Sequence, residues 1–594
     1  MADIYKIFPA IGIARVGNSE EYYLAPESPG GLPILSGGGD FQQSDFRDGQ
    51  KKLRRQGARF RIYRYPEAGG APEEVLVGAN GVEQITWTVR LANKKSNWYE
   101  FRTKEGENGY SPNHPLRNPD VSGEDRKLLA IDPGSRTLTN VGQSVYFDRN
   151  PVNNPDSYPM IWPPETLYPL DKYPDPLYPG TPSTINRLGE AHTDTQGHLI
   201  VVGGFGRSGS DVNPPEIHDY ANNDNWWDDT SDGPISAQVV VNGETIEVSP
   251  AWVLVGPPAY APEIVNLVTL YDTIFDVAVR YMGARPDMYQ DGFWQQDYQP
   301  DYVREIKPIL DRASMFPWVV AIPPKPHTFN SELLGNTNPE YNNMRQYFFD
   351  QIRAPNQKNT LKSPKTGYPM MPYLAGDDAT GASQKSAKYF TLTDTQYFLL
   401  GQWVQGKFTN TGSATELDPG EELTRAALVS CVGGPFSPGI EMSWISRNPK
   451  LYTEPFRIKH KPMEPNQELS LGINLDAGME PGDVTKFMAL PWQADFNECS
   501  TQTLDRIVWW WPAQRPYFVY LPPEAAPRAI PDENLKDQQV PWVGTDYDQK
   551  AADYVMFAND LEMVEKWDKL GFVLNLQSAE DPYFVEVERI LPRD

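Results

Sequence analysis

Prolines occur along the whole length of this chain and limit how long its helices and strands can be. There are 57 prolines in 594 residues, and no single tract collects them. Ordinary usage is about 5%. Proline removes a backbone donor and is tolerated poorly inside helices and central strands, so we expect much irregular, turn-bounded backbone. The 16 Trp, 31 Tyr and 24 Phe supply large side chains for burial, which excludes disorder caused by a lack of apolar surface.

The charge balance argues against two classes of partner. The chain carries 53 basic and 79 acidic residues, a net charge of −26, which repels nucleic-acid phosphates and anionic membranes. No apolar run approaches the roughly 20 residues of a membrane helix. Arg15 interrupts the only apolar stretch near the N-terminus. We therefore expect no membrane span, no signal peptide and a cytoplasmic location.

The first part of the chain has the pattern of short strands. Residues 84–91 and 198–202 are rich in β-branched residues and lie between turn residues. Residues 238–248 read as two strands joined by Asn242-Gly243, a dipeptide typical of tight hairpin turns. The sequence predicts a β-rich N-terminal domain over residues 1–250.

The spacing of apolar residues then becomes helical. Residues 262–280 carry apolar side chains three and four apart, with Pro262 near the start and an acidic residue in the first turn. We predict a helical connector over 251–355 and a C-terminal domain over 356–594 that begins with a loop rich in Pro, Gly, Lys and Ser. The expected fold class is mainly β with helical insertions (α+β), in two large β-rich parts.

A helix is also predicted near the C-terminus. Five apolar residues lie three or four apart on one stripe, and Gly571 ends the helix: Phe557, Leu561, Val564, Trp567 and Leu570. Trp567 is therefore expected to point inward. For an arbitrary Trp, a purely structural place in the apolar stripe is the usual explanation.

Several motifs that suggest a ligand have simpler explanations. Residues 204–209 have the glycine spacing of a dinucleotide fingerprint, but Pro214-Pro215 would break the helix that must follow, so a glycine-rich turn is expected. Residues 222–232 gather carboxylates and amides without the spacing of an EF-hand loop, and Asx-turns explain them. The six histidines form no helical metal-binding pair, and no Gly-x-Ser-x-Gly elbow occurs. No metal site is expected.

The two cysteines, Cys431 and Cys499, are too few for a disulfide framework or a thiolate metal site. A single disulfide, two inert buried thiols and chemically active sulfur all remain possible. Asp495 precedes Cys499 by four residues, so on a helix the carboxylate and the sulfur share a face. Such a carboxylate can accept a proton from a thiol or an indole, and a plain carboxylate on a helix surface is the alternative.

A resemblance to a known family rests on longer segments. Residues 430–442 and 490–499, together with 8–19, 26–30, 222–234 and 567–573, resemble the family of lysine epsilon-oxidase and glycine oxidase. The similarity extends over nearly the whole chain. Members of this family carry cysteine tryptophylquinone, a cofactor built from the protein's own side chains.

The resemblance implies a role for each matching residue. Cys499 and Trp567 would form the thioether crosslink of the quinone, and Asp495 would be the base used in cofactor maturation. Cys431 would be an active-site neighbour that is not crosslinked. Tyr220 would lie at the substrate entrance.

The resemblance also implies the reaction and the partners. A quinoprotein oxidase of this kind would deaminate a primary amine, with an amino acid as the expected substrate, and use molecular oxygen to give a carbonyl product, ammonia and hydrogen peroxide. A flavin-dependent maturation protein and homo-oligomerisation are expected. The alternatives are a family member that oxidises another amine or a peptide-bound substrate in a biosynthetic pathway, and a non-enzymatic binding scaffold on the same fold.

The substrate is the least determined of these expectations. In the family's lysine and glycine oxidases we would look for a Lys or His soon after the crosslinking Cys, but here none occurs between Cys499 and Lys536, which puts both substrates in doubt. Arg506 and Arg515 are the nearby cations. A guanidinium, that of Arg515 in particular, can bind a substrate carboxylate, although a surface salt bridge is the stronger explanation.

Overall fold

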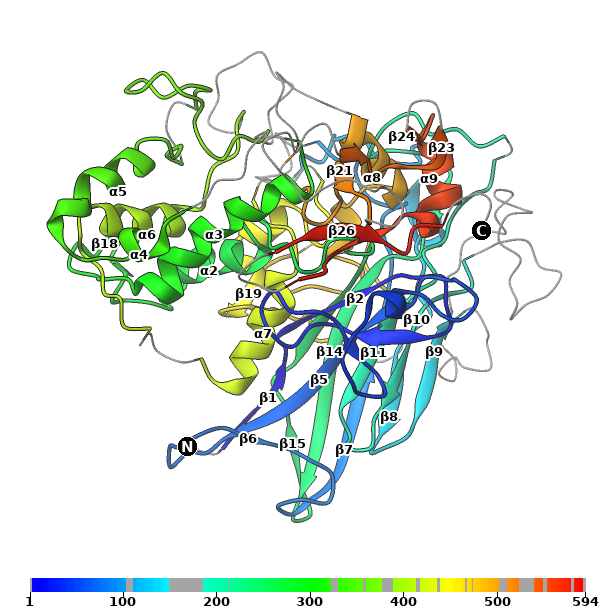
Figure 1. Cartoon of the computed structure of the whole chain (residues 1–594). Helices are drawn as coiled ribbons and strands as arrows, with labels where there is room; N and C mark the ends of the chain where they lie inside the picture. The colour runs from blue at the N-terminus through cyan, green and yellow to red at the C-terminus, as the bar shows by residue number, and fades with distance from the viewer. Residues whose placement is uncertain are drawn as a thin grey trace.

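A computed structural model gives the fold of the chain (Figure 1). The residues that it describes are 3–102, 110–148, 185–212, 214–321, 329–355, 359–376, 388–412, 417–434, 438–464, 467–472, 474–501, 509, 511–522, 539–548, 553–577 and 582–590. The side chains of residues 499–501, 546–548 and 553–554 lie outside this description.

A sheet of 14 strands dominates the described part of the chain (Figure 1). Its main path is β8-β7-β14-β16-β2-β5-β11-β10-β9, and the five other strands pair along its sides. On this path only β16 and β2 pair in parallel, and the other neighbours are antiparallel. The strands of the sheet are β1 (Ile4–Phe8), β2 (Ile11–Arg15), β3 (Tyr22–Leu24), β4 (Ile34–Leu35), β5 (Arg55–Tyr65), β6 (Glu73–Glu74), β7 (Val82–Val89), β8 (Arg136–Thr139), β9 (Ser144–Asp148), β10 (Arg187–Thr193), β11 (Leu199–Gly203), β14 (Ser231–Val241), β15 (Glu244–Glu247) and β16 (Ala251–Gly256).

The burial of the central strands of the sheet agrees with their sequence. Every residue of β2 and β16 is buried, and both are nearly continuous apolar runs, which is typical of strands that are covered on both faces. At the edge, Asn242 and Gly243 join β14 to β15 with φ of 49° and 83°. The predicted hairpin is therefore confirmed, because the left-handed conformation at both positions is what a tight hairpin turn requires.

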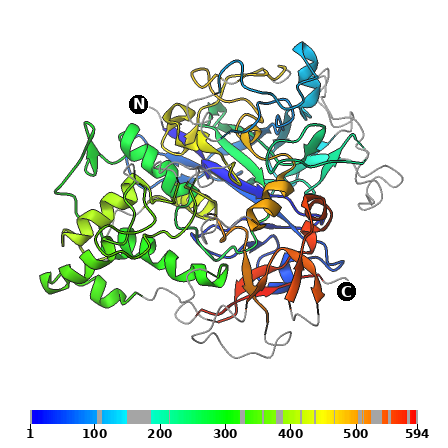
Figure 2. The ribbon, with the colours of Figure 1, turned by 90° about the horizontal axis from the view of Figure 1, so that it is seen from above.

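Helices cover one side of this sheet (Figures 1 and 2). The helix α7 packs against β1 and β2, α2 packs against α7, and α6 packs against α2. These and the remaining helices are α2 (Leu270–Tyr281), α3 (Lys307–Met315), α4 (Ser331–Leu334), α5 (Asn342–Phe349), α6 (Asp394–Val404), α7 (Pro419–Val429), α8 (Trp492–Thr501) and α9 (Asp560–Lys566). The predicted start near Pro262 is wrong: α2 begins at Leu270, because Thr269 and Asp272 form a capping box there.

Short antiparallel pairs make up the other described strands. They pair as β12 (Ser208–Ser210) with β13 (Trp226–Asp228), β17 (Tyr289–Gln290) with β18 (Phe293–Trp294), β19 (Tyr452–Glu454) with β20 (Arg457–Ile458), β21 (Phe518–Tyr520) with β22 (Gln539–Pro541), β23 (Gly544–Asp548) with β24 (Asp553–Met556), and β25 (Phe572–Asn575) with β26 (Phe584–Val587). The predicted fold class, mainly β with helical insertions, is confirmed.

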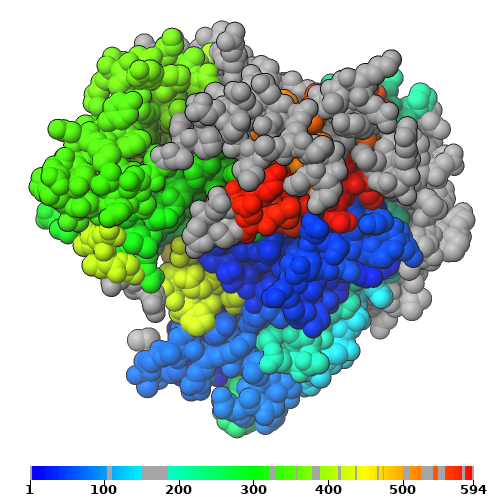
Figure 3. All heavy atoms as spheres, in the orientation of Figure 1, coloured from blue at the N-terminus to red at the C-terminus, as the bar shows by residue number. Residues whose placement is uncertain are grey.

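The end of the chain packs against its beginning. Figure 3 shows the C-terminal strands next to the N-terminal segment on one face of the molecule. Phe46 stacks on Phe572 with 3.9 Å between ring centroids, and the Arg47 guanidinium donates to the Leu570 carbonyl at 3.1 Å. The segment that follows α9 is thereby fixed to the first 50 residues.

The division into three parts at residues 250 and 355 stays a prediction, because helices lie on both sides of residue 355. The buried apolar residues form two large clusters: the main core contains Trp567 and the second core contains Cys431. Among the described residues, no helix has the length and apolar character needed to span a membrane.

Candidate active site

Trp567 is the first residue of a short 3-10 turn, η11 (Trp567–Lys569), directly after α9. Its side chain is 1% exposed. Its main-chain carbonyl accepts a hydrogen bond from the Tyr260 hydroxyl at 2.8 Å, and its indole Nε1 makes no hydrogen bond within the described part of the chain. The prediction that Trp567 points inward is confirmed, although α9 begins only at Asp560, after the first residue of the predicted stripe.

Two residues far away in the sequence touch the indole ring. Trp492 packs edge-on against it, with 5.4 Å between ring centroids and 71° between ring planes. A Cβ on Gly206 would lie 2.2 Å from Cζ2 and 2.5 Å from Cη2 of Trp567, and Gly206 has a φ of +71°. Any side chain at position 206 would therefore collide with the ring and strain the backbone.

This contact gives residues 204–209 their place in the fold. The strand β12 begins inside this motif, at Ser208, where a nucleotide site would need a helix N-terminus, so the predicted glycine-rich turn is confirmed for residues 204–207. The turn lies against Trp567.

The helix α8 packs against α9 and brings the two halves of the predicted cofactor to neighbouring elements. Asp495 and Cys499 are four residues apart on α8, as predicted. Asp495 is 2% exposed, so the alternative of a surface carboxylate is wrong. The Cys499 side chain lies outside the described side chains, and its crosslink to Trp567 stays a prediction.

A small cavity lies beside Asp495. Its volume is about 20 Å³, and its lining includes Trp492, Asp495, Phe496 and Lys95. A cavity of this size holds about one water molecule. It admits an amine group but not a whole amino acid.

The start of α8 is fixed by a buried ion pair. Asp228 accepts hydrogen bonds from the Trp492 main-chain N–H at 3.1 Å and from the Lys95 ammonium at 2.8 Å. Lys95 also donates to the Ala489 carbonyl at 2.9 Å. Burial lowers the pKa of Lys95, and Asp228 opposes the shift. This structural role accounts for one carboxylate of residues 222–232. Among the residues that the structure describes, no three His, Cys, Asp or Glu side chains are grouped to hold a metal ion.

Cys431 is a free, fully buried thiol that follows α7. Its sulfur donates to the Ala427 carbonyl at 3.4 Å and lies 3.8 Å from the Arg15 guanidinium, which pairs with Glu441 at 2.8 Å. Burial, and then the Glu441 charge, raise the pKa of Cys431 well above its ordinary value, so the thiol is neutral.

A short chain of contacts joins Cys431 to the cavity. Arg15 also donates to the Pro257 carbonyl at 2.9 Å, and Pro257 lines the cavity beside Asp495. No direct contact between Cys431 and Trp567 is described, so its place as an active-site neighbour stays a prediction.

Arg515 is fully buried, and the expectation of a surface salt bridge is wrong for it. Its Nε donates to the main-chain carbonyl of Phe496 on α8, and its guanidinium lies 4.9 Å from the Tyr517 ring centroid and 5.9 Å from that of Trp542. Aromatic rings stabilise a cation in this setting. Arg515 thus contacts Phe496, which lines the cavity beside Asp495. Arg506 lies outside the described residues.

Tyr220 is partly buried and packs against the second core. The next residue, Ala221, accepts a hydrogen bond from the Leu490 N–H at 3.0 Å, which places this loop beside the segment leading into α8. Its predicted role at the substrate entrance is not tested by these contacts and stays a prediction.

Three residues near Trp567 were not predicted as site residues. Tyr260 carried no signal. Trp492 and Asp229 lie in segments 490–499 and 222–234, which carry the family resemblance, but nothing in the sequence indicates that the fold brings them to Trp567. Gly206 lay within a motif that was noticed. Its signal was a glycine-rich turn without the helix that a nucleotide site needs.

Two family models and a curated relative match most of this chain. Residues 8–255 match the family described as "L-Lysine epsilon oxidase N-terminal", and residues 373–517 match the "L-lysine epsilon oxidase C-terminal domain". The L-lysine 6-oxidase of Marinomonas mediterranea is 34% identical over 545 residues, covering 84% of this chain and 72% of the relative.

Solved structures show the same fold. The epsilon-lysine oxidase of Marinomonas mediterranea superposes with a TM-score of 0.82 and 28% identity, covering 98% of this chain and 95% of the other. A structure of the Schiff base intermediate of that organism's L-Lys epsilon-oxidase with L-Lys gives a TM-score of 0.81 and 27% identity, with the same coverage. The family recognised from the sequence is confirmed: this chain belongs to the L-lysine epsilon oxidase family.

Proposed function

We propose that this chain is a quinoprotein oxidase that deaminates a primary amine, with an amino acid as the expected substrate. Amine, oxygen and water would give a carbonyl product, ammonia and hydrogen peroxide. The observation that carries the proposal is the burial of Trp567 beside α8, the helix that bears Asp495 and Cys499.

The relatives support oxidation of an amine. The curated relative is named L-lysine 6-oxidase, and one solved relative is a Schiff base intermediate with L-Lys. A Schiff base joins an amine to a carbonyl carbon, and no unmodified side chain of this sequence carries an aldehyde or ketone. Both facts favour a cofactor with an electrophilic carbonyl.

The residues present fit cysteine tryptophylquinone. Trp567 and Cys499 would form it, and Trp492 and Gly206 lie against the indole ring of Trp567. When formed, the cofactor supplies an electrophilic carbonyl and accepts two electrons, a capacity that ordinary side chains lack.

The surrounding residues bind, orient and exclude water. Burial of the indole disfavours a charged ammonium group, so the substrate amine meets the site as a neutral nucleophile. Asp495 lines the cavity, which supports a role as the acceptor of a proton from the substrate or, during maturation, from the Cys499 thiol or the indole. Tyr260 holds the main chain of Trp567.

The recognition of the substrate carboxylate is proposed for Arg515. Its guanidinium is fixed to the carbonyl of Phe496, a cavity residue, and lies inside the core. A fixed guanidinium binds a carboxylate with two parallel hydrogen bonds. Tyr220 remains the candidate for the entrance.

The decisive experiment is intact and peptide mass spectrometry of the chain co-produced with its candidate flavin-dependent maturation protein. The proposal expects a gain of two oxygens and a loss of four hydrogens, with the Cys499 and Trp567 peptides linked. A primary-amine screen for peroxide release would then identify the substrate. An unmodified mass in the presence of an active maturation protein would contradict the oxidase and leave the binding scaffold.

A variant tests the role of Asp495. Asp495→Ala, co-produced with the maturation protein, should lack the quinone absorbance, because the buried proton acceptor nearest to Cys499 on α8 is gone. Glu498→Ala is the matched control: it removes a carboxylate from the same helix at a partly exposed position and should mature normally. Normal absorbance and turnover in Asp495→Ala would remove Asp495 from both proposed roles.

A further inference from the structure

The turn formed by residues 204–207 lies against the indole ring of Trp567. It joins β11 to β12 and places Gly206 against Cζ2 and Cη2 of Trp567, two adjacent carbons of the benzene ring. The proposed quinone would carry its two carbonyls on adjacent carbons of this ring. A small displacement of this turn would therefore act on the ring that would become the cofactor.

The turn is held from the side of α8. The Gln493 amide donates to the Gly206 carbonyl at 3.1 Å, and the Ser208 hydroxyl donates to the Gln493 side-chain oxygen at 2.6 Å. Gln493 is fully buried and adjoins Trp492, which packs on the same indole. Two hydrogen bonds of Gln493 thus fix this side of the turn to α8.

The other side of the turn lies against Asp229, which is 1% exposed. The Asp229 main-chain N–H donates to the Arg207 carbonyl at 3.0 Å. The carboxylate lies under Gly204, where an added Cβ would come within 2.7 Å of Oδ2. The main-chain N–H groups of Arg207 and Phe205 in the turn interact with this carboxylate, but within the described part of the chain neither of its oxygens accepts a hydrogen bond of ordinary geometry. A buried carboxyl group in this state calls for an explanation, because nearly all buried polar groups are paired.

Neutralisation explains how the fold tolerates this group. Burial raises the pKa of Asp229 to about 7. The main-chain N–H groups of Arg207 and Phe205 and the Arg207 charge oppose this shift, and the neighbouring Asp228 charge adds to it. The charged groups that face it are Asp228 on β13, Arg207 on the turn and Lys95 beside Asp228. At neutral pH the side chain thus exchanges between a neutral acid and an anion directly beneath the turn.

We propose that Asp229 is a positioning residue for Trp567 and acts through the 204–207 turn. It does not touch the ring. Its neutral form packs under Gly204 and lets Gly206 lie against the indole, and its anion attracts the turn amides and Arg207 and displaces Gly206 from that position. The inference rests on the proposed function, since it concerns the geometry of the cofactor that Trp567 would form.

The test uses the full chain, co-produced with the maturation protein, and compares wild type with Asp229→Asn. The quinone absorbance of wild type should change across pH 6 to 8 with a midpoint close to the pKa of about 7, and Asp229→Asn should keep the low-pH spectrum throughout. Its kcat should lose the same pH-dependent step while KM for the amine is unchanged. A spectral titration in Asp229→Asn identical to that of wild type would overturn the proposal.

Asp211→Asn is the matched control for this change. Asp211 lies at the far end of β12, its pKa is also raised by burial, and its Oδ1 has no hydrogen bond among the described residues. It does not contact the turn, so its variant should titrate like wild type. Loss of the spectral step in Asp211→Asn as well would contradict a specific role for Asp229.

A second pair of variants tests the turn if Asp229→Asn fails to fold. Gly206→Ala should lower the crosslinked fraction, measured on peptides, by about tenfold or more, because a displacement of about 1 Å at reacting groups has effects of that order. Gly243→Ala has a similar φ of +83°, and nothing lies within 4 Å of its added Cβ. It should mature fully. Equal crosslinking in both variants would contradict the inference, whereas wild type without any crosslink would contradict the proposed function itself.

Discussion

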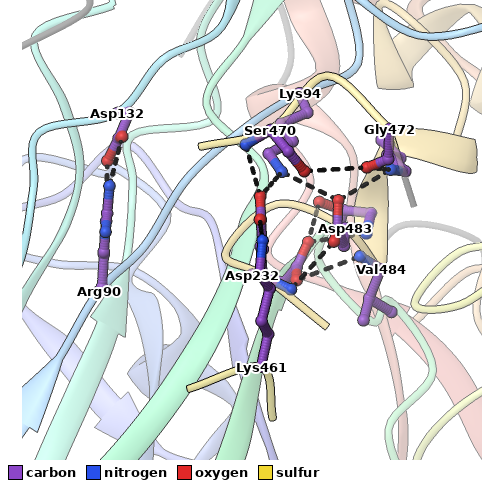
Figure 4. A network of polar contacts seen from close by, with 12 residues as sticks. Arg90, Lys94, Asp132, Asp232, Lys461, Ser470, Gly472, Asp483 and Val484 are labelled. Atoms are coloured by element: carbon purple, nitrogen blue, oxygen red, sulfur yellow. Dashed lines mark hydrogen bonds and ion pairs between the residues drawn. The ribbon is translucent and has the colours of Figure 1, made fainter. Parts of the chain in front are cut away.

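Two buried polar regions of this molecule satisfy their polar groups very differently. In the first, the Lys94 ammonium donates to Glu480 and Asp483 at 3.0 Å each, Lys486 also pairs with Asp483, and Asp232 accepts from Thr485 and Val484 (Figure 4). Burial alone would raise the pKa of Glu480, but Lys94 and Lys461 lower it to about 2. We call this set of residues the lysine network.

In the second region, around Trp567, paired and unpaired groups lie together. Within the described residues, the indole Nε1 atoms of Trp492 and Trp567 make no hydrogen bond, and both carboxylate oxygens of Asp229 lack one of ordinary geometry. Tyr260 and Gln493, in contrast, are paired. We call this region the indole pocket.

This difference in pairing suggests that the lysine network serves the stability of the fold and the indole pocket serves the reaction. A fully paired buried network fixes one arrangement of the chain, and removing one member leaves an uncompensated charge. Unpaired buried groups lower stability and persist where they serve a site. The lysine network is therefore expected to respond to mutation in the free energy of unfolding, and the indole pocket in cofactor formation and turnover.

The largest effect is expected at Trp567. Trp567→Phe should remove the crosslink and lower amine oxidation by at least about a thousandfold, because no remaining side chain accepts two electrons. Trp403→Phe is the control: Trp403 is equally buried and donates to the Leu334 carbonyl at 3.0 Å in the helical part. Peptide mass spectrometry and peroxide assays should find it mature and active. A mature, active Trp567→Phe would end the distinction between the two regions.

The lysine network should give the next largest effect, on stability alone. Lys94→Met leaves Glu480 and Asp483 buried with one ammonium fewer and should lower the free energy of unfolding by about 3 to 5 kcal/mol in denaturant titrations. Lys461→Met removes a partner that is 29% exposed and should cost about 1 kcal/mol or less. Quinone content per folded molecule should be unchanged in both variants. Loss of quinone in Lys94→Met would show that the two regions are coupled.

The pH dependence of stability should distinguish Asp229 from Asp232. Folding raises the pKa of Asp229 from 3.8 to about 7 through burial, so the folded chain binds an extra proton between these values and loses stability as pH rises through them. Asp229→Asn removes this penalty. Its advantage over wild type should grow by about 3 kcal/mol between pH 5 and pH 8.

Asp232 supplies the opposite case. Burial raises the pKa of Asp232 to about 6, but its carboxylate accepts from Thr485, Val484 and the Trp252 indole. Asp232→Asn should therefore destabilise the chain at pH 8, since an amide cannot accept all of these bonds. If thermal melts showed the same sign for both variants, the contrast between a paired and an unpaired carboxylate would not hold.

The strand patterns and the motif residues predicted much of the fold. The hairpin at Asn242-Gly243 and the inward-facing Trp567 follow from local turn chemistry and helical spacing, which depend on neighbours in the sequence. The start of α2 was placed too early, because a capping box at Thr269 outweighs a Pro at 262 that has no cap. Local signals thus located the elements better than their ends.

The environment of the site was not predictable in the same way. Whether Arg515 forms a surface salt bridge or a buried cation among rings depends on Tyr517, Trp542 and the carbonyl of Phe496, which meet only in the folded chain. The same holds for Gly206, whose contact with Trp567 requires the sheet and α9 to be in place. Composition and spacing carry no information about such contacts.

The smallest effect is expected from a comparison of two hydrogen bonds between a tyrosine and a main-chain carbonyl, one in the indole pocket and one in the second core. Tyr260 donates to the Trp567 carbonyl at 2.8 Å, and Tyr452 donates to the Ser446 carbonyl at 2.7 Å in the second core. Both side chains are buried, so Tyr260→Phe and Tyr452→Phe should each cost about 1 kcal/mol of unfolding free energy. Only Tyr260→Phe should also shift the quinone absorbance and lower kcat, because its hydroxyl holds the residue that reacts. Equal kcat in the two variants would mean that the anchor at Trp567 serves stability alone, and the indole pocket would then differ from the rest of the core only in its unpaired groups.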